Sequence, residues 1–307
     1  MTRGEHSVKS PADGAVIDRV DPPVAVATSG IIDVQDAWQA HLTDERNDWA
    51  DPNRDEGFWA ANVESYEDRL IEPPAGIGVI DALLEGGESA LEIGPGTGRY
   101  TRRLSQRVDR VTAIEDATPV RSYLRSSLEA AGLADSVDIV PRSWEHVTIV
   151  EASDAESTAA RLSPHDVVVA GWSLYRQPEL GECLERIHAA ANTGFVLIDS
   201  PGAVPPHRRL AIDADETVLP SPPPRAAYYS TLLADCGLFP EVHIERRPRV
   251  RRASTLERLV ADLLGNAAIE PDTAADALDP WLNRHDGGWE YRYELPVAVL
   301  VWRASDA

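Results

Sequence analysis

The stretch SALEIGPGTGRY at residues 89–100 constrains the fold more than any other part of the sequence. An apolar run at residues 90–93, interrupted only by Glu92, ends in the glycine-rich segment 94–98, and a helix-compatible stretch follows at residues 99–107. This order predicts a buried strand, a tight turn and a helix start. Because glycine lacks a Cβ and adopts positive φ at little cost, the turn would let the backbone approach a bound nucleotide closely.

A carboxylate follows the next predicted strand. Residues 111–114 form an apolar run, and Glu115 comes directly after it. In an open α/β sheet, Glu115 would lie beside the glycine turn and could accept hydrogen bonds from both hydroxyls of a ribose. The pair predicts a nucleoside-containing ligand. The alternative is a glycine turn in an α/β protein that binds no ligand.

The spacing of the glycines distinguishes two kinds of nucleotide site. A dinucleotide fingerprint requires GxGxxG, whereas this turn reads GxGxG, and Arg99 stands at the place of the third glycine. With this spacing and the acid at Glu115, the chain resembles the class I S-adenosylmethionine-dependent methyltransferases over residues 76–240. The resemblance implies that Gly94, Gly96 and the carboxyl of Glu115 bind S-adenosylmethionine.

Gly98 completes that implied cofactor loop, and Glu92 would orient it or reach the methionine ammonium of the cofactor. Trp144 could stack on the adenine, and Glu145 could accept a hydrogen bond from its amino group. The family usually has an acid directly after the third strand, whereas this sequence has Arg142 shortly after it. These assignments follow from the resemblance.

The resemblance implies a doubly wound, mostly parallel seven-stranded sheet of order 3-2-1-4-5-7-6, with helices on both faces and an antiparallel last strand. We expect a disordered tail at residues 1–30, an N-terminal helical cap at 31–75 and a Rossmann-like domain at 76–303, with insertions at 200–225 and 253–288. The insertion at 200–225 holds seven prolines, which favours an ordered loop or lid over a regular helix or strand.

Hydrophobic patterning predicts the individual elements of this domain. The predicted strands cover residues 90–93, 111–114, 137–140, 167–170, 194–198, 241–245 and 289–302. The predicted helices cover residues 77–84, 99–107, 119–131, 177–191, 226–236 and 256–264, with further helical turns at 269–284.

Aromatic residues gather in the predicted cap. Its segment FWAANVESYEDRL resembles the N-terminal helix that many of these enzymes place over the cofactor, so Tyr66 and Trp59 would cover the sulfonium or the methionine end. The alternative is that these rings pack a helix onto the sheet, and we favour such packing for Trp38 and Trp49.

The segment GWSLY at residues 171–175, which includes Trp172, follows the fourth predicted strand and should face the reaction centre. Methyl transfer from a sulfonium is an in-line displacement that needs mainly orientation, and it needs a base only when the acceptor loses a proton. Tyr175 is our preferred positioning group, and His207 is the preferred base if one is used. The alternative for His207 is an exposed histidine in a proline-rich loop.

Five arginines fall within residues 246–252, and Arg225 lies in the predicted lid. If both segments converge on the acceptor, Arg249 and Arg251 would bind a carboxylate or phosphate. The alternative is charge balance with neighbouring carboxylates.

Composition narrows the class of protein further. The net charge is −22, and 28 of the 29 basic residues are arginine, which resembles the proteins of halophilic archaea. The two cysteines suggest neither a disulfide framework nor a thiolate metal site, and we predict no bound metal. No signal peptide or membrane-spanning run is apparent, so we expect a cytoplasmic protein.

We therefore expect an S-adenosylmethionine-dependent methyltransferase that acts on a small-molecule acceptor. The Asn/Asp-Pro-Pro-aromatic signature of many amino- and base-methylating enzymes is absent at residues 171–175. One alternative is an RNA methyltransferase that uses the arginines, although an acidic surface ordinarily repels nucleic acid. The other alternative is a cofactor-binding regulatory protein without turnover.

Overall fold

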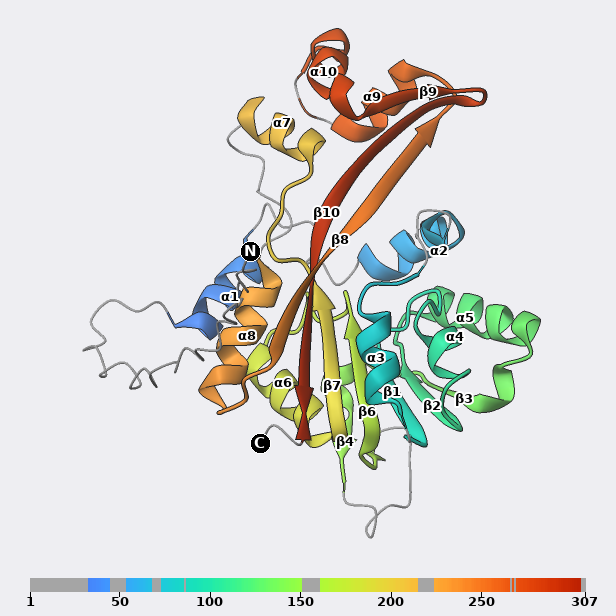
Figure 1. Cartoon of the computed structure of the whole chain (residues 1–307), viewed down its shortest axis with the longest axis vertical. Coiled ribbons are helices and arrows are strands. Elements are labelled where there is room, and N and C mark those ends of the chain that lie inside the picture. Colours follow the sequence, from blue (N-terminus) through green and yellow to red (C-terminus); the bar gives the residue numbers. More distant parts are fainter. Residues whose placement is uncertain are drawn as a thin grey trace, which may run out of the picture. The chain divides into compact units, whose positions relative to one another are not determined.

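A mixed sheet organises the chain in this computed structural model, which describes residues 33–44, 54–67, 73–85, 87–150, 161–214, 224–265, 267 and 269–304 (Figure 1). The expected tail and Trp49 lie outside these residues. The strands of the sheet are β1 (Ser89–Ile93), β2 (Arg110–Ile114), β3 (Val137–Val140), β6 (His165–Gly171), β7 (Ala191–Asp199), β8 (Glu241–Ala253), β9 (Leu282–His285) and β10 (Gly288–Arg303).

The sheet has the order β3-β2-β1-β6-β7-β10-β8, with β9 paired to β10. Strands β3, β2, β1, β6 and β7 are parallel, whereas β10 runs antiparallel to both β7 and β8. The predicted strand order and the antiparallel last strand are confirmed. Strand β9 is an addition that the sequence analysis did not predict, since it assigned helical turns there.

The strand register brings the glycine turn and Glu115 to one edge of the sheet. Ile93, the last residue of β1, pairs with Ile114 of β2 and with Ala170 of β6. The segments that follow these three residues therefore leave the sheet side by side. This edge is where open parallel sheets bind their ligands.

Helices cover both faces of the sheet because side chains alternate along buried strands. Leu91 of β1 faces a core shared with α1 (Val34–Thr43), α6 (Leu180–Ala189) and α8 (Arg225–Asp235). Ala90 faces the opposite core, which α3 (Ile77–Leu83), α4 (Thr101–Leu104) and α5 (Thr118–Ala131) complete. The remaining helices are α2 (Arg54–Glu67), α7 (Pro206–Ala214), α9 (Leu256–Leu264) and α10 (Pro271–Leu278), and a two-stranded parallel sheet joins β4 (Thr148–Ile149) to β5 (Arg161–Leu162).

Local signals explain where several helices begin and end. Pro119 lies in the first turn of α5, where its missing N–H has no helical partner, and Gly132 ends the helix with φ 68°. The carboxylate of Asp33 caps α1 by accepting from the backbone N–H of Gln35 at 2.8 Å. In the described part of the chain, no helix combines the length and the apolar character needed to cross a membrane.

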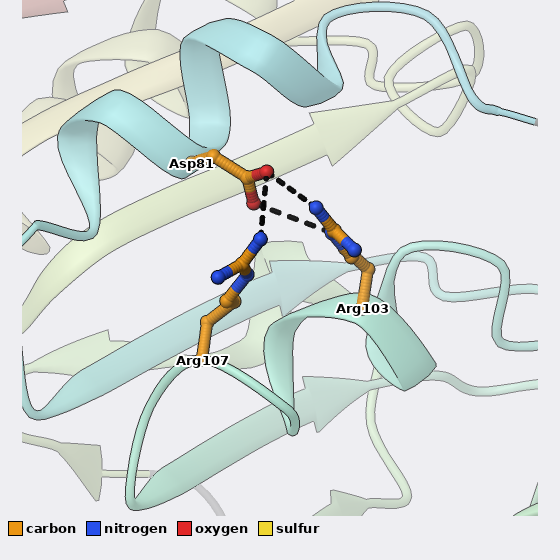
Figure 2. Close-up of polar contacts among 3 residues, drawn as sticks. All are labelled: Asp81, Arg103 and Arg107. Atoms are coloured by element: carbon orange, nitrogen blue, oxygen red, sulfur yellow. Dashed lines mark hydrogen bonds and ion pairs between the residues drawn. The ribbon is translucent and has the colours of Figure 1, made fainter.

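A carboxylate holds α3 against the segment that follows the glycine turn (Figure 2). Asp81 of α3 accepts from Arg103 of α4 at 2.5 Å and from Arg107 at 3.2 Å. These ion pairs are partly exposed, so each contributes a modest stabilisation. Their structural effect is to fix α4, and with it the end of the glycine turn, beside the sheet.

The arginine-rich segment lies within a strand, which corrects the prediction that strand six ends at residue 245. Strand β8 continues to Ala253, and its whole length pairs with β10. Since β8 is an edge strand, Pro248 is tolerated within it although proline cannot donate to the ladder. We call residues 246–253 with 288–296 the distal ribbon. It continues past the end of β7, whose pairing with β10 stops at Ala298 (Figure 1).

The proline-rich insertion also differs from prediction. Residues 206–214 form helix α7, because consecutive prolines at 205 and 206 lie at the helix start, where proline is tolerated.

A third apolar cluster covers the distal ribbon and contains Leu259, Leu263 and Leu278 of α9 and α10 together with Tyr291 and Tyr293 of β10.

Candidate functional site

A cavity of about 700 Å³ opens at the edge of the sheet where β1, β2 and β6 end, a size typical of small-molecule sites. It is lined by residues of five segments. They are Trp59 and Tyr66 of α2; Ile93, Gly94, Pro95, Gly96, Thr97, Arg99 and Tyr100; Ile114, Glu115, Asp116 and Ala117; Arg142, Ser143, Trp144 and Glu145; and Gly171, Trp172, Ser173, Tyr175, Arg176, Gln177 and Pro178.

The glycines of the turn serve different purposes. A Cβ on Gly94, where φ is 66°, would lie 2.4 Å from the Cβ of Ser173, and one on Gly98 would lie 2.5 Å from Leu124. At Gly96, where φ is 55°, a Cβ would meet no atom within 4 Å. Gly94 and Gly98 are therefore required by packing, whereas the space above Gly96 belongs to the cavity and leaves its backbone accessible to a ligand.

Two hydroxyl groups in the cavity wall have no hydrogen-bond partner in the described part of the chain. The Oγ1 atom of Thr97 and the Oγ atom of Ser173 are buried, and neither hydrogen-bonds to a described residue. Buried polar groups normally have a partner, so these two groups indicate a ligand that supplies one. The open space above Gly96 and the two hydroxyls fit a polar nucleoside-type ligand.

Glu115 lies at the same wall. Its carboxylate accepts from the backbone N–H of Ala117 at 3.0 Å. Burial raises the pKa of Glu115 to about 7, and the N–H groups of Ala117 and Gly96 oppose that rise by stabilising the carboxylate. A carboxylate held in this way can accept two further hydrogen bonds from neighbouring ligand hydroxyls.

Glu92 lies beneath the turn and not in the cavity wall. It is 1% exposed, and its Oε2 atom accepts from the hydroxyl of Thr101 at 2.6 Å. Of the two roles predicted for Glu92, this position favours orientation of the loop, because Thr101 is the first residue of α4.

The pH dependence of stability should report on Glu92. Burial raises its pKa from 4.5 to about 7, so the folded protein binds a proton that unfolding releases. Its contribution to stability is therefore present below pH 4.5 and is lost as pH rises towards 7, by about 3 kcal/mol in total. Relative to a Glu92→Gln variant, wild type should lose this amount in urea denaturation across that range. A difference between the two proteins that stays constant with pH would contradict the assignment.

Trp172 has a strained backbone. With φ at 59°, it is the one residue other than glycine with positive φ in the described ranges. Its backbone N–H donates to the carbonyl of Ile198 on β7 at 2.9 Å, which holds the strained conformation in place. Strain of this kind costs about 1–3 kcal/mol and occurs often at functional sites.

Helix α2 brings aromatic rings to the cavity. Tyr66 and Trp59 both line it, and their ring centroids are 5.2 Å apart in an edge-to-face arrangement. Trp38, by contrast, is fully buried and donates from Nε1 to the carbonyl of Gln177 at 2.7 Å, so it packs as expected.

The predicted adenine contacts receive different support from their positions. Trp144 borders the cavity but is 2% exposed in the core, where its ring contacts Arg186. Packing in the core therefore accounts for most of the burial of the Trp144 ring. Glu145 is exposed, and its Oε1 atom lies 3.8 Å from the Nδ1 atom of His146.

The two catalytic candidates lie in different places. Tyr175 lines the cavity, and burial raises its pKa to about 12, so its phenol stays protonated and can position a ligand. His207 lies on α7, where it contacts the hydroxyl of Tyr291 at 3.1 Å. Burial, with the charges of Arg251 and Arg208, lowers its pKa to about 4. His207 is not among the residues that line the cavity, and at neutral pH it is a weak base.

Arg251 also lies away from the cavity, near His207 and Tyr293.

The sequence analysis assigned no role to a buried carboxylate close to the site. Asp199, which ends β7, accepts from Arg225 at 2.7 Å and from Tyr229 at 2.8 Å. The signal was available, because Asp199 follows an apolar run just as Glu115 does.

Comparison with known proteins finds similarity to solved structures alone. No family model and no curated protein sequence matches this chain. Among solved structures, it is similar to the YcgJ protein of Bacillus subtilis, with 10% identity, coverage of 74% of this chain and 97% of that one, and a TM-score of 0.48. It is also similar to a SAM-dependent methyltransferase of Aquifex aeolicus, with 13% identity, 80% and 97% coverage and a TM-score of 0.44. A third is the magnesium protoporphyrin IX methyltransferase of Synechocystis PCC 6803 with bound SAM, with 10% identity, 90% and 99% coverage and a TM-score of 0.43.

Proposed function

We propose that this protein transfers a methyl group from S-adenosylmethionine to a small-molecule acceptor. The observation that carries the proposal is that the Gly96 backbone and the Glu115 carboxyl border one cavity at the ends of adjacent parallel strands. A nucleoside-sized space, a carboxylate for a ribose and two buried hydroxyls that bond to no described residue support this assignment.

Each group in the cavity has a role in this proposal. Glu115 would accept hydrogen bonds from the ribose hydroxyls, and Thr97 would hydrogen-bond to a polar group of the cofactor. When bound, the cofactor supplies an electrophilic methyl group on a sulfonium that leaves as a neutral thioether. Tyr66 and Trp172 would exclude water, and the protonated phenol of Tyr175 would orient the acceptor. In this scheme orientation supplies most of the catalysis.

The cofactor assignment is tested by calorimetric titration with S-adenosylhomocysteine in concentrated salt, which screens the net charge of −22. Replacing Glu115 by alanine removes charge-assisted hydrogen bonds, so affinity should fall by about 10–100-fold. Wild-type affinity should also weaken as pH falls below about 7, because the ligand requires the carboxylate.

A matched control is Glu129→Ala, which removes a carboxylate from the exposed side of α5 and should leave affinity unchanged. Equal affinities of the Glu115→Ala and wild-type proteins would refute the assignment of Glu115. Failure of the wild-type protein to bind S-adenosylhomocysteine at all would refute the proposed function. Transfer of labelled methyl from S-adenosylmethionine into a small-molecule extract tests turnover.

A further inference from the structure

Arg249 of β8 approaches an aromatic ring of the cavity wall and has no carboxylate partner among the described residues. Its guanidinium carbon lies 5.9 Å from the ring centroid of Trp172, which borders the cavity. The side chain is half-buried, and neither a hydrogen bond nor an ion pair joins it to any residue in the described part of the chain. Arginine carries five N–H donors, so this one retains the capacity to bind a ligand.

The chain does not lack carboxylates that could have paired with Arg249. It contains 51 acidic and 29 basic residues. Burial lowers the pKa of Arg249, Tyr293 and Tyr66 act to raise it, and the like charges of Arg99 and Arg247 lower it. The planar guanidinium of arginine matches the geometry of a carboxylate or a phosphate.

A second guanidinium converges on the same ring. The guanidinium carbon of Arg225 lies 6.0 Å from the Trp172 ring and 5.9 Å from the Tyr175 ring. Its Nε donates to Asp199 at 2.7 Å, which fixes the group in place, while its terminal nitrogens donate to no described residue. Arg225 and Arg249 come from consecutive elements of the chain, α8 and β8. They meet at the residue with the strained backbone.

We propose that Arg249 binds an oxyanion of the methyl acceptor over the ring of Trp172, which Arg225 also approaches, so that the acceptor is a small anionic molecule carrying a carboxylate or a phosphate. The inference rests on the proposed function and adds the class of its substrate. The guanidinium fork binds such groups through two parallel hydrogen bonds.

The surrounding arginines favour a small anion over a nucleic acid. Arg252 and Arg292 of the distal ribbon both pair with Glu290, at 2.7 and 2.9 Å. Arg247 lies 3.7 Å from Glu245. Two carboxylates therefore offset two of these three positive charges, whereas a polyanion is bound by a continuous positive surface. Arg249 differs from these three because no carboxylate of the described ranges pairs with it.

The inference is tested by titrating the protein with benzoate and with inorganic phosphate, at constant ionic strength and with saturating S-adenosylhomocysteine. Benzamide is the neutral match for benzoate. We expect an anion to bind wild type and Arg249→Gln to weaken that binding by about 10–100-fold. Arg252→Gln is the control, since it removes a guanidinium of the same ribbon that is already paired. Both variants should bind S-adenosylhomocysteine as wild type does, which also shows that they fold.

The outcomes separate this inference from the proposed function. Preference for benzoate or for phosphate identifies the acceptor group as a carboxylate or a phosphate. If neither anion binds wild type, or if Arg249→Gln binds them equally well, the inference is overturned while the cofactor assignment stands. Binding of a polyribonucleotide that both variants weaken alike would overturn it in favour of a nucleic-acid surface. Failure of S-adenosylhomocysteine to bind wild type refutes the proposed function itself.

Discussion

The Gly94→Ala variant is expected to lose more than about 100-fold in affinity for S-adenosylhomocysteine. The new Cβ would lie 2.4 Å from the Cβ of Ser173, a separation that real structures do not tolerate. It would also stand on a backbone with φ 66°, which disfavours residues with a Cβ. The turn must therefore shift, and the backbone of Gly96 shifts with it relative to Glu115. Calorimetric titration measures the loss.

Gly132→Ala provides the matched control for this prediction. Gly132 has φ 68°, similar to Gly94, but a Cβ there would meet no atom within 4 Å. The residue lies at the end of α5, outside the cavity. That variant should lose about 1 kcal/mol of stability and keep its affinity. Normal binding by Gly94→Ala would show that the turn does not contact the ligand.

The largest expected loss of stability follows the Asp199→Ala substitution, at about 3–5 kcal/mol. Asp199 is 1% exposed, and besides Arg225 and Tyr229 it accepts from the backbone N–H of Ser200 at 2.7 Å. Its removal leaves a partly buried guanidinium and a buried phenol without their acceptor. The free energy of unfolding in urea measures the loss.

Asp138→Ala is the corresponding control, because Asp138 also pairs with an arginine but on the surface. It lies 2.6 Å from Arg110, and both side chains are more than half exposed. Such pairs contribute about 0–1 kcal/mol. If Asp199→Ala and Asp138→Ala lost equal stability, burial would not be the cause of the effect.

Local sequence was sufficient for the parts of the site that one strand and its turn define. GPGTG at residues 94–98 predicted the turn, and the acid after the second apolar run predicted that Glu115 would lie beside it. Both border the cavity. These predictions depend on short-range properties, namely the absence of a Cβ and the alternation of apolar residues along a strand.

Local sequence gave a wrong prediction where a strand is rich in charged residues. RRPRVRR at residues 246–252 has neither the alternation nor the apolar content of a strand, so strand β8 was predicted to end too early. Its partner β10 supplies the hydrogen bonds, and the edge position tolerates both the proline and the charges. The seven prolines of residues 200–225 likewise led to the prediction of a loop. Helix α7 forms there because two of the prolines, at 205 and 206, lie at the start of the helix, where proline is tolerated.

The sequence by itself determined the glycine turn and the place of Glu115 at the end of its strand, because those features depend on neighbouring residues along the chain, whereas the strand order was implied by the family resemblance. Only the tertiary structure decided which of the predicted substrate-binding arginines lies near Trp172, a residue of the cavity wall. Arg249 contacts Trp172 while Arg251, two residues further, lies near His207. That outcome depends on how far β8 and β10 extend past the end of β7, and therefore on packing between segments that are distant in sequence.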